Sequence, residues 1–337
     1  MVPPVGVTNS AHPAPTITPE DSGGDANADA QQASASCPTS AADGSDSALS
    51  SVCSAGGCVG EDWAGWPMPN SAVDFAAGAP NLESYTVHGD GTVTDAVTGL
   101  MWQQTAPSLS YTWADAKAYC MGLTLAGYAD WRLPTTIELI SIVDYSKNVP
   151  ALDMAAFAGG TSEVWSSTPF ARTPSTAWEI CFAAGDTGGD SVVASNFVRC
   201  ARGPAPNSSM VLTPARYTVI NGTAYDTRTK LTWQQAVPSA PYTWADARTY
   251  CANLGVNGNG GWRLPTVKEL MTIVDVAKST SPAIDCEAFP AAGADNLWSS
   301  TPFAGFSRQP YAWGVNFDVG HPISIDVTYA NSVRCVH

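Results

Sequence analysis

Basic residues are scarce in this sequence. Its 337 residues include 15 lysines and arginines against 30 aspartates and glutamates, which gives a formal net charge of −15. Nucleic-acid binding needs a basic patch that neutralises phosphates, so the composition argues against DNA or RNA as a partner. We expect the arginines of the repeated motifs to pair with nearby acids rather than to form a local basic patch. These are Arg132, Arg199, Arg202, Arg263 and Arg334.

Long apolar runs are also lacking. No stretch of about 18 apolar residues occurs, so we expect no transmembrane segment. The N-terminus does not show the basic and then apolar pattern of a signal sequence. Residues 1–62 are rich in Ala, Ser, Asp, Gly and Pro, a composition that cannot bury enough surface to fold. We expect a disordered leader whose export signal has been trimmed away or lies upstream.

Internal repetition organises the rest of the chain. Several motifs occur twice in the same order, and a period this long indicates two domains rather than a solenoid of small units. The matched segments are 98–104 with 229–235, 111–116 with 242–247, 131–135 with 262–266, 165–170 with 298–303, and 198–200 with 333–335. We place copy one at 63–203 and copy two at 217–337, joined by a polar linker at 204–216.

Each copy is expected to contain two helices and short antiparallel strands, which is an α+β arrangement. Thr112 with Asp115 predicts the start of a first helix, and Thr135 with Glu138 forms the pattern of a capping box for a second. The same residue types recur in copy two. The expected strands of copy one cover 84–87, 91–95, 100–103, 178–182 and 197–200 and the neighbourhood of Trp165.

Nine cysteines are present, and two of them recur at matching positions. Cys120 ends the first helix and Cys200 ends the last strand, so these two could form a bridge, as could Cys251 and Cys335. Closing a loop of about 80 residues would stabilise each copy by roughly 4 kcal/mol in the chain-entropy model. The alternative is four buried free thiols. Because disulfides persist in oxidising compartments, the bridges favour an exported protein.

Five further cysteines do not recur, so at least one is free or bonded to another chain. They are Cys37, Cys53, Cys58, Cys181 and Cys286. A bridge between Cys53 and Cys58 is a further possibility.

The motifs resemble the Lcl C-terminal domain family, which is named after a collagen-like adhesin. The resemblance rests on Gly-Asp-Gly at 89–91, Thr-Gly-Leu-Met-Trp at 98–102, Trp-Arg-Leu-Pro-Thr at 131–135, Trp-Ser-Ser at 165–167 and Val-Arg-Cys at 198–200. Copy two lacks only the clear Gly-Asp-Gly hairpin. The resemblance implies two tandem C-type-lectin-like domains, each with a disulfide from the first helix to the last strand. It also implies an exported bacterial protein involved in adhesion. The collagen-like Gly-X-Y stretch is absent, which puts trimerisation through such a stalk in doubt.

The Arg-Leu-Pro-Thr signature is also similar to that of the formylglycine-generating, sulfatase-modifying enzymes, a related fold. Those enzymes require paired reactive cysteines that hold copper, whereas Cys181 and Cys286 occupy different positions in the two copies. The four histidines do not recur between the copies either. We therefore expect a binding protein rather than an enzyme.

No cofactor or metal is expected. Calcium-dependent lectins use oxygen-rich motifs such as Trp-Asn-Asp, and the matching strands here carry Trp-Ser-Ser. Recurring aspartates could hold a structural calcium ion, although capping and loop hydrogen bonds are the favoured interpretation. They are Asp144, Asp153, Asp275 and Asp285.

Ligand binding is expected in the variable loops, because the two copies differ most there. These loops cover 170–178 and 186–195 in copy one and 303–313 and 318–329 in copy two. The candidate ligand-binding residues are Arg172, Trp178, Asp186, Asp190, Arg308, Tyr311, Trp313 and Asp318. The tryptophans of the repeated motifs are expected in the core. The expected partner is an extracellular glycan or protein, bound by a secreted or cell-surface protein. A structural envelope component without glycan binding is the alternative.

Overall fold

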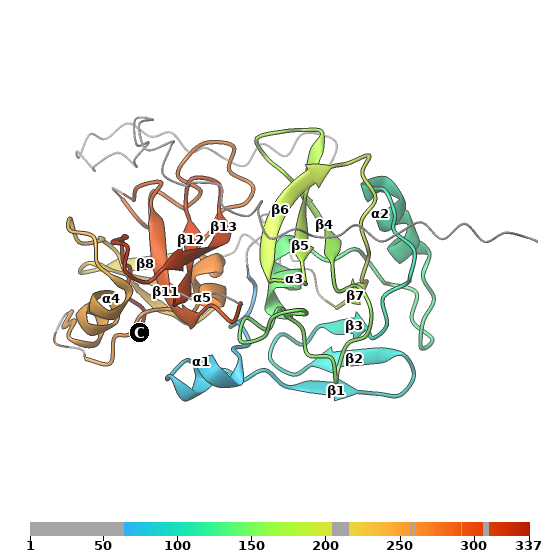
Figure 1. The fold of residues 1–337 in the computed structure, drawn as a ribbon, viewed down its shortest axis with the longest axis horizontal. Coiled ribbons are helices and arrows are strands. Elements are labelled where there is room, and N and C mark those ends of the chain that lie inside the picture. The colour runs from blue at the N-terminus through green and yellow to red at the C-terminus, as the bar shows by residue number, and fades with distance from the viewer. Residues whose placement is uncertain (1–63, 204–215, 257, 259, 291, 306–309) are drawn as a thin grey trace, which may run out of the picture. The chain divides into compact units, whose positions relative to one another are not determined.

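Each copy of the repeat folds into two helices and two small antiparallel sheets, as expected for an α+β protein (Figure 1). The computed structural model describes residues 64–337 except 204–215, 257, 259, 291 and 306–309. The expectations for the leader, for almost all of the linker, for Arg308 and for a Cys53–Cys58 bridge lie outside the described residues. None of the helices in the described part of the chain is both long and apolar enough to cross a lipid bilayer.

Copy one contains an antiparallel sheet of order β1-β2-β3-β7 and a second of order β4-β5-β6. Its elements are β1 (Tyr85–Val87), β2 (Thr92–Asp95), β3 (Met101–Gln103), α2 (Trp113–Gly122), α3 (Thr136–Ser141), β4 (Glu163–Pro169), β5 (Thr176–Cys181), β6 (Asp186–Ser191) and β7 (Ala201–Arg202). The expected strand at 197–200 is wrong: Phe197 makes an isolated bridge to Val164, and β7 begins after Cys200.

Copy two repeats this plan with sheets of order β10-β9-β8 and β11-β12-β13. Its elements are β8 (Tyr217–Ile220), β9 (Thr223–Asp226), β10 (Thr232–Gln234), α4 (Trp244–Ala252), α5 (Val267–Thr272), β11 (Asn296–Pro302), β12 (Tyr311–Asn316) and β13 (His321–Asp326). Its first hairpin turns at Asn221 and Gly222, whose φ angles are +50° and +80°. Asn-Gly suits a two-residue turn with positive φ at both positions, so a different turn replaces the Gly-Asp-Gly hairpin of copy one.

The helix starts follow the predicted capping residues. The Thr135 side chain accepts the Glu138 N–H and the Glu138 side chain accepts the Thr135 N–H, so α3 begins with a complete capping box. At α2 the Thr112 side chain accepts the Asp115 N–H. The shorter Asp115 carboxylate accepts the Thr112 hydroxyl over 2.7 Å instead of completing the box.

Two of the segments expected as loops contain strands. Residues 186–195 begin with β6, and 318–329 contain β13. The sequence of β6 is Asp-Thr-Gly-Gly-Asp-Ser, which has little intrinsic strand preference. It is a strand because it pairs in register with β5, where Gly188 lies opposite Glu179. A Cβ atom at Gly188 would lie 2.7 Å from the Glu179 carboxylate, so glycine allows the Glu179 side chain to lie over β6.

Tryptophans form the centre of the core, as expected. Trp102, Trp165, Trp233 and Trp298 have no exposed surface. One apolar cluster contains residues of both copies, and two smaller clusters each surround one repeated cysteine pair. The two copies therefore share one core, and each also buries a smaller cluster of its own around its cysteine pair.

A short helix near the start of copy one, α1 (Ala72–Ala76), makes buried hydrogen bonds to copy two. The Thr301 hydroxyl donates to the buried Asp74 carboxylate over 2.9 Å. The Thr266 hydroxyl donates to the Asn70 side chain over 2.8 Å. The segment that opens copy one in the sequence thus binds the start of α5 and the end of β11.

Candidate functional site

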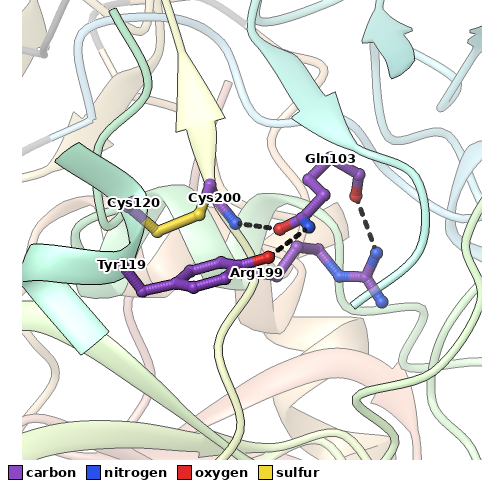
Figure 2. Close-up of a disulfide and its surroundings, with 5 residues drawn as sticks. All are labelled: Gln103, Tyr119, Cys120, Arg199 and Cys200. Atoms are coloured by element: carbon purple, nitrogen blue, oxygen red, sulfur yellow. Dashed lines mark hydrogen bonds between the residues drawn. A yellow bond between two sulfur atoms is a disulfide. The ribbon is translucent and has the colours of Figure 1, made fainter. Parts of the chain in front are cut away.

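In each copy a disulfide joins the helix that carries the first repeated cysteine to a cysteine near the end of that copy's sequence. In copy one Cys120 of α2 is bonded to Cys200, with a Cα–Cα distance of 5.5 Å. Figure 2 shows Gln103 beside the bridge. Its amide donates to the Tyr119 hydroxyl over 3.0 Å, and its side-chain oxygen accepts the Cys200 N–H over 3.2 Å. The expected bridge is present, and these bonds fix the Tyr119 hydroxyl near it.

Copy two builds the same centre. Cys251 of α4 is bonded to Cys335 with a Cα–Cα distance of 5.4 Å, so the second expected bridge is also present. Gln234 donates to the Tyr250 hydroxyl over 2.9 Å and accepts the Cys335 N–H over 3.2 Å. All four repeated cysteines are fully buried.

A buried arginine next to each bridge is held by backbone carbonyls. Arg199 donates to the carbonyl oxygens of Gln103, Gln104, Ala158 and Gly159 over 2.6–3.1 Å. It has no exposed surface, and burial lowers its pKa to about 9. The guanidinium is therefore still charged at neutral pH, and the carbonyl dipoles compensate its charge.

Arg334 is the counterpart in copy two, where it donates to the carbonyl oxygens of Gln234 and Gln235. Burial lowers its pKa to about 9 as well. The expectation that every repeated arginine pairs with an acid is wrong for these two, because the described residues that surround them offer carbonyls. The other three do pair with acids. They form Arg132–Glu138, Arg202–Asp130 and Arg263–Glu269.

The tryptophans proposed as ligand-binding residues are buried. Trp178 and Trp313 are each 2% exposed. The ring of Tyr145 from copy one packs edge-on against Trp313 of copy two, with 5.1 Å between centroids. This contact fills space between the copies, so neither indole is open to a ligand as the sequence interpretation required.

Arg172 and Asp318 are the two described candidates that the structure brings together. Each comes from a different copy, and the Arg172 guanidinium donates to the Asp318 carboxylate over 3.3 Å and to its backbone carbonyl. Both side chains are partly exposed, at 28% and 48%. They make a contact between copies rather than an open binding surface.

The remaining candidates are strand residues. Asp186 and Asp190 lie on β6, where Asp190 accepts the side-chain amide of Asn196 over 3.1 Å. Tyr311 begins β12 and packs edge-on against Phe303, with 6.4 Å between centroids. These side chains take part in the ordinary hydrogen bonds and packing of their sheets.

The recurring aspartates form turns. Each accepts the backbone N–H of the residue two positions further on, the geometry of an Asx turn. They are Asp144, Asp153, Asp275 and Asp285. In the part of the chain that the structure describes, no group of three or more His, Cys, Asp or Glu residues could hold a metal ion. The loop hydrogen bonds favoured from the sequence account for these carboxylates.

An aromatic groove lies along α4 in copy two and encloses about 610 Å³. Tyr242 and Tyr250 are half-buried in it, with ring centroids 5.0 Å apart and planes inclined by 37°. The residues that line it are Pro241, Tyr242, Thr243, Asp246, Thr249, Tyr250, Asn253, Leu254, Gly255 and Ala330. The Tyr250 hydroxyl accepts a hydrogen bond from Gln234 of the disulfide centre, and this bond fixes the position of the ring.

Copy one repeats the pair of rings. Tyr111 and Tyr119 lie 5.1 Å apart with an inclination of 38°. The sequence interpretation named neither tyrosine as a candidate binding residue. The signal that it missed is the repetition of the two tyrosines on either side of a helix start, which sets their rings side by side at the surface.

The family model of the Lcl C-terminal domain matches residues 91–202 and again 222–337. Together these segments cover both disulfides, both buried arginines and the tyrosine pairs. The resemblance seen in the motifs is thereby confirmed. No curated protein matches the chain.

Proposed function

Because the chain belongs to the Lcl C-terminal domain family, we propose that it is an exported, adhesin-like protein that binds an extracellular glycan or protein. One observation carries the proposal: the two copies share one framework, but exposed residues around it differ. The Gln-to-Tyr bond beside the bridge measures 3.0 Å in copy one and 2.9 Å in copy two. A constant scaffold with variable exposed residues is typical of binding domains.

Two observations support a location outside the cytoplasm. Each copy has a disulfide that closes a long segment, with sequence separations of 80 and 84 between the bonded cysteines. Both bridges are fully buried within the aromatic clusters. Bridges that tie a domain from helix to terminus persist where thiols are kept oxidised, which favours a secreted or cell-surface protein.

Binding rather than catalysis fits the chemistry of the thiol. Cys181 is the free cysteine among the described residues. Burial raises the pKa of its thiol to about 11. A thiolate is the reactive form of cysteine, and little of it would exist at neutral pH. This thiol is therefore poorly suited to nucleophilic or copper chemistry.

The proposal is tested with the intact, oxidised chain on an array of glycans and extracellular proteins. We expect saturable binding to a subset of them, lost after reduction and alkylation of the two repeated bridges. Binding to none, combined with concentration-dependent self-association, would instead support a structural envelope component and would overturn the proposed role.

A further inference from the structure

We propose that the tyrosine-lined groove of copy two binds an uncharged sugar residue, and that the matching surface of copy one does not. The inference rests on the proposed function and assigns it to one place. A groove with aromatic walls and a few polar groups is the usual form of a small-ligand site. Tyrosine serves such sites well because its ring is rigid and amphipathic.

The polar groups of the groove are available to a ligand. The Thr249 hydroxyl donates to the Ala245 carbonyl over 3.0 Å, which leaves its oxygen lone pairs to accept a sugar hydroxyl. Asn253 ends α4 as its exposed C-cap, and its side-chain amide makes no hydrogen bond within the described residues. The Asp246 carboxylate accepts the Thr243 hydroxyl over 2.7 Å and keeps further acceptor capacity. Sugar hydroxyls, which both donate and accept, match this set.

The two copies differ at two positions that line this groove and at a third next to it in the chain. Copy two has Thr249 and Asn253 where copy one has Ala118 and Gly122. Tyr329, the chain neighbour of the groove residue Ala330, is 65% exposed.

Copy one has Ala194 at the position of Tyr329. The two residues are equivalent because each donates its N–H to the carbonyl three residues earlier, at the same turn after the last long strand. At all three positions copy two carries a side chain that can bond or stack, and copy one carries a small one.

Charge selects the class of sugar. Asp246 is the one charged residue among the described lining residues. Arg248, also on α4, lies over the Trp244 ring at 5.0 Å from its centroid and does not line the groove. A sulfated or carboxylated sugar would meet a carboxylate without a cation, and the chain as a whole carries a formal charge of −15. An uncharged residue avoids this repulsion.

The test uses the intact chain and a set of uncharged probes: lactose, cellotriose, maltotriose and chitotriose. Sialyllactose and a heparin hexasaccharide serve as anionic comparisons. We expect at least one uncharged probe to bind with a stoichiometry of one per chain, measured by calorimetry. The variant T249A/N253G/Y329A, which gives copy two the small residues of copy one, should weaken that binding by about tenfold or more.

The same variant should keep its fold, because copy one already folds with those residues and Ala favours a helix more than Thr. An unchanged melting temperature and near-ultraviolet spectrum check this. The matched control A118S/A194S alters copy one and should leave binding unchanged. A folded T249A/N253G/Y329A variant that binds like the parent would overturn the groove assignment while leaving the proposed function intact. Binding of the anionic probes alone would overturn it too. Failure of the parent chain on every glycan and protein tested would overturn both.

Discussion

Lys268 of copy two donates a hydrogen bond from its Nζ to the backbone carbonyl of Ser141 in copy one, over 2.9 Å. The side chain is 2% exposed. Burial lowers the pKa of the ammonium, and the carboxylates of Glu83 and Asp144 act in the opposite direction. The matching residue of copy one is Ile137, so copy one has no lysine at this position to make the reciprocal hydrogen bond. The side chain of a buried lysine thus links α5 to α3 inside the shared core.

Replacing this lysine tests the linkage. We expect Lys268→Met to lower the free energy of unfolding by about 2 kcal/mol, because the Ser141 carbonyl loses its donor in a buried place. The nearby carboxylates also lose a cation. Urea titration followed by tryptophan fluorescence measures the change. Ile137→Met is the matched control and should cost less than about 1.5 kcal/mol, since it conserves volume. An equal effect of the two substitutions would contradict the role of the charge.

A buried carboxyl in copy one predicts a dependence of stability on pH. Burial, with a smaller effect of Asp186, raises the pKa of Glu179 to about 8. One of its carboxylate oxygens is buried without a hydrogen-bond partner. In the unfolded chain a glutamate has a pKa of about 4.3, so between this pH and the pKa of the folded state only the folded state holds the proton. This group therefore stabilises the fold at low pH, and the stabilisation is lost as pH rises through about 8.

We expect the free energy of unfolding to fall between pH 5 and pH 9 by about 2 kcal/mol more in the parent than in Glu179→Gln. This figure is smaller than the full shift implies, because the side chain keeps some contact with water. Chemical denaturation across the pH range measures it. Glu287, an exposed glutamate of copy two, supplies the control: Glu287→Gln should leave the pH profile unaltered. If the free energy of unfolding depended on pH in the same way in the parent and in Glu179→Gln, this carboxyl would not be the cause of the dependence.

The two bridges should contribute comparable stability. We expect the pairs C120S/C200S and C251S/C335S each to lower the free energy of unfolding by about 4 kcal/mol, from the loop length that each bridge closes. Because the copies share a core, losing either bridge should lower one common transition rather than split it. Differential scanning calorimetry measures this. Cys181→Ser removes the free thiol and should change the melting temperature little; two separated transitions would contradict the shared core.

The carbonyl cage around Arg199 predicts that lysine cannot replace arginine there. Lysine has three donors on one nitrogen and cannot reach four carbonyls spread around a planar guanidinium. We expect Arg199→Lys to cost about 3 kcal/mol, since carbonyls are left buried without donors. The control is Arg202→Lys, whose partner Asp130 is 62% exposed, and which should cost less than about 1 kcal/mol. Equal costs in urea denaturation would contradict the cage.

The sequence predicted what is local or repeated. Thr135 with Glu138 marked a helix start because the two side chains and backbone groups that satisfy one another lie within one turn. The bridges could be predicted because Cys120 and Cys200 recur as Cys251 and Cys335. Strand β6 was missed because its Gly-rich sequence becomes a strand only through pairing with β5.

The predicted ligand-binding tryptophans were wrong because their burial depends in part on contacts between the copies. Trp178 and Trp313 were chosen because they end segments that vary between the copies, but Trp313 is buried in part by Tyr145 of the opposite copy. Neither repeat alone contains that information. The groove tyrosines were passed over because candidates were sought where the copies differ, and only the structure shows these half-buried rings side by side.

The placement of α1 sets an order of events during synthesis. Asn70 and Asp74 are made at the start of copy one, whereas their partners Thr266 and Thr301 are made only in copy two. The early segment therefore lacks these two partners until most of copy two has been translated. A polypeptide that stops after copy one would therefore expose α1 without the residues that bind it. The helix can dock only once Thr266 and Thr301 have been made.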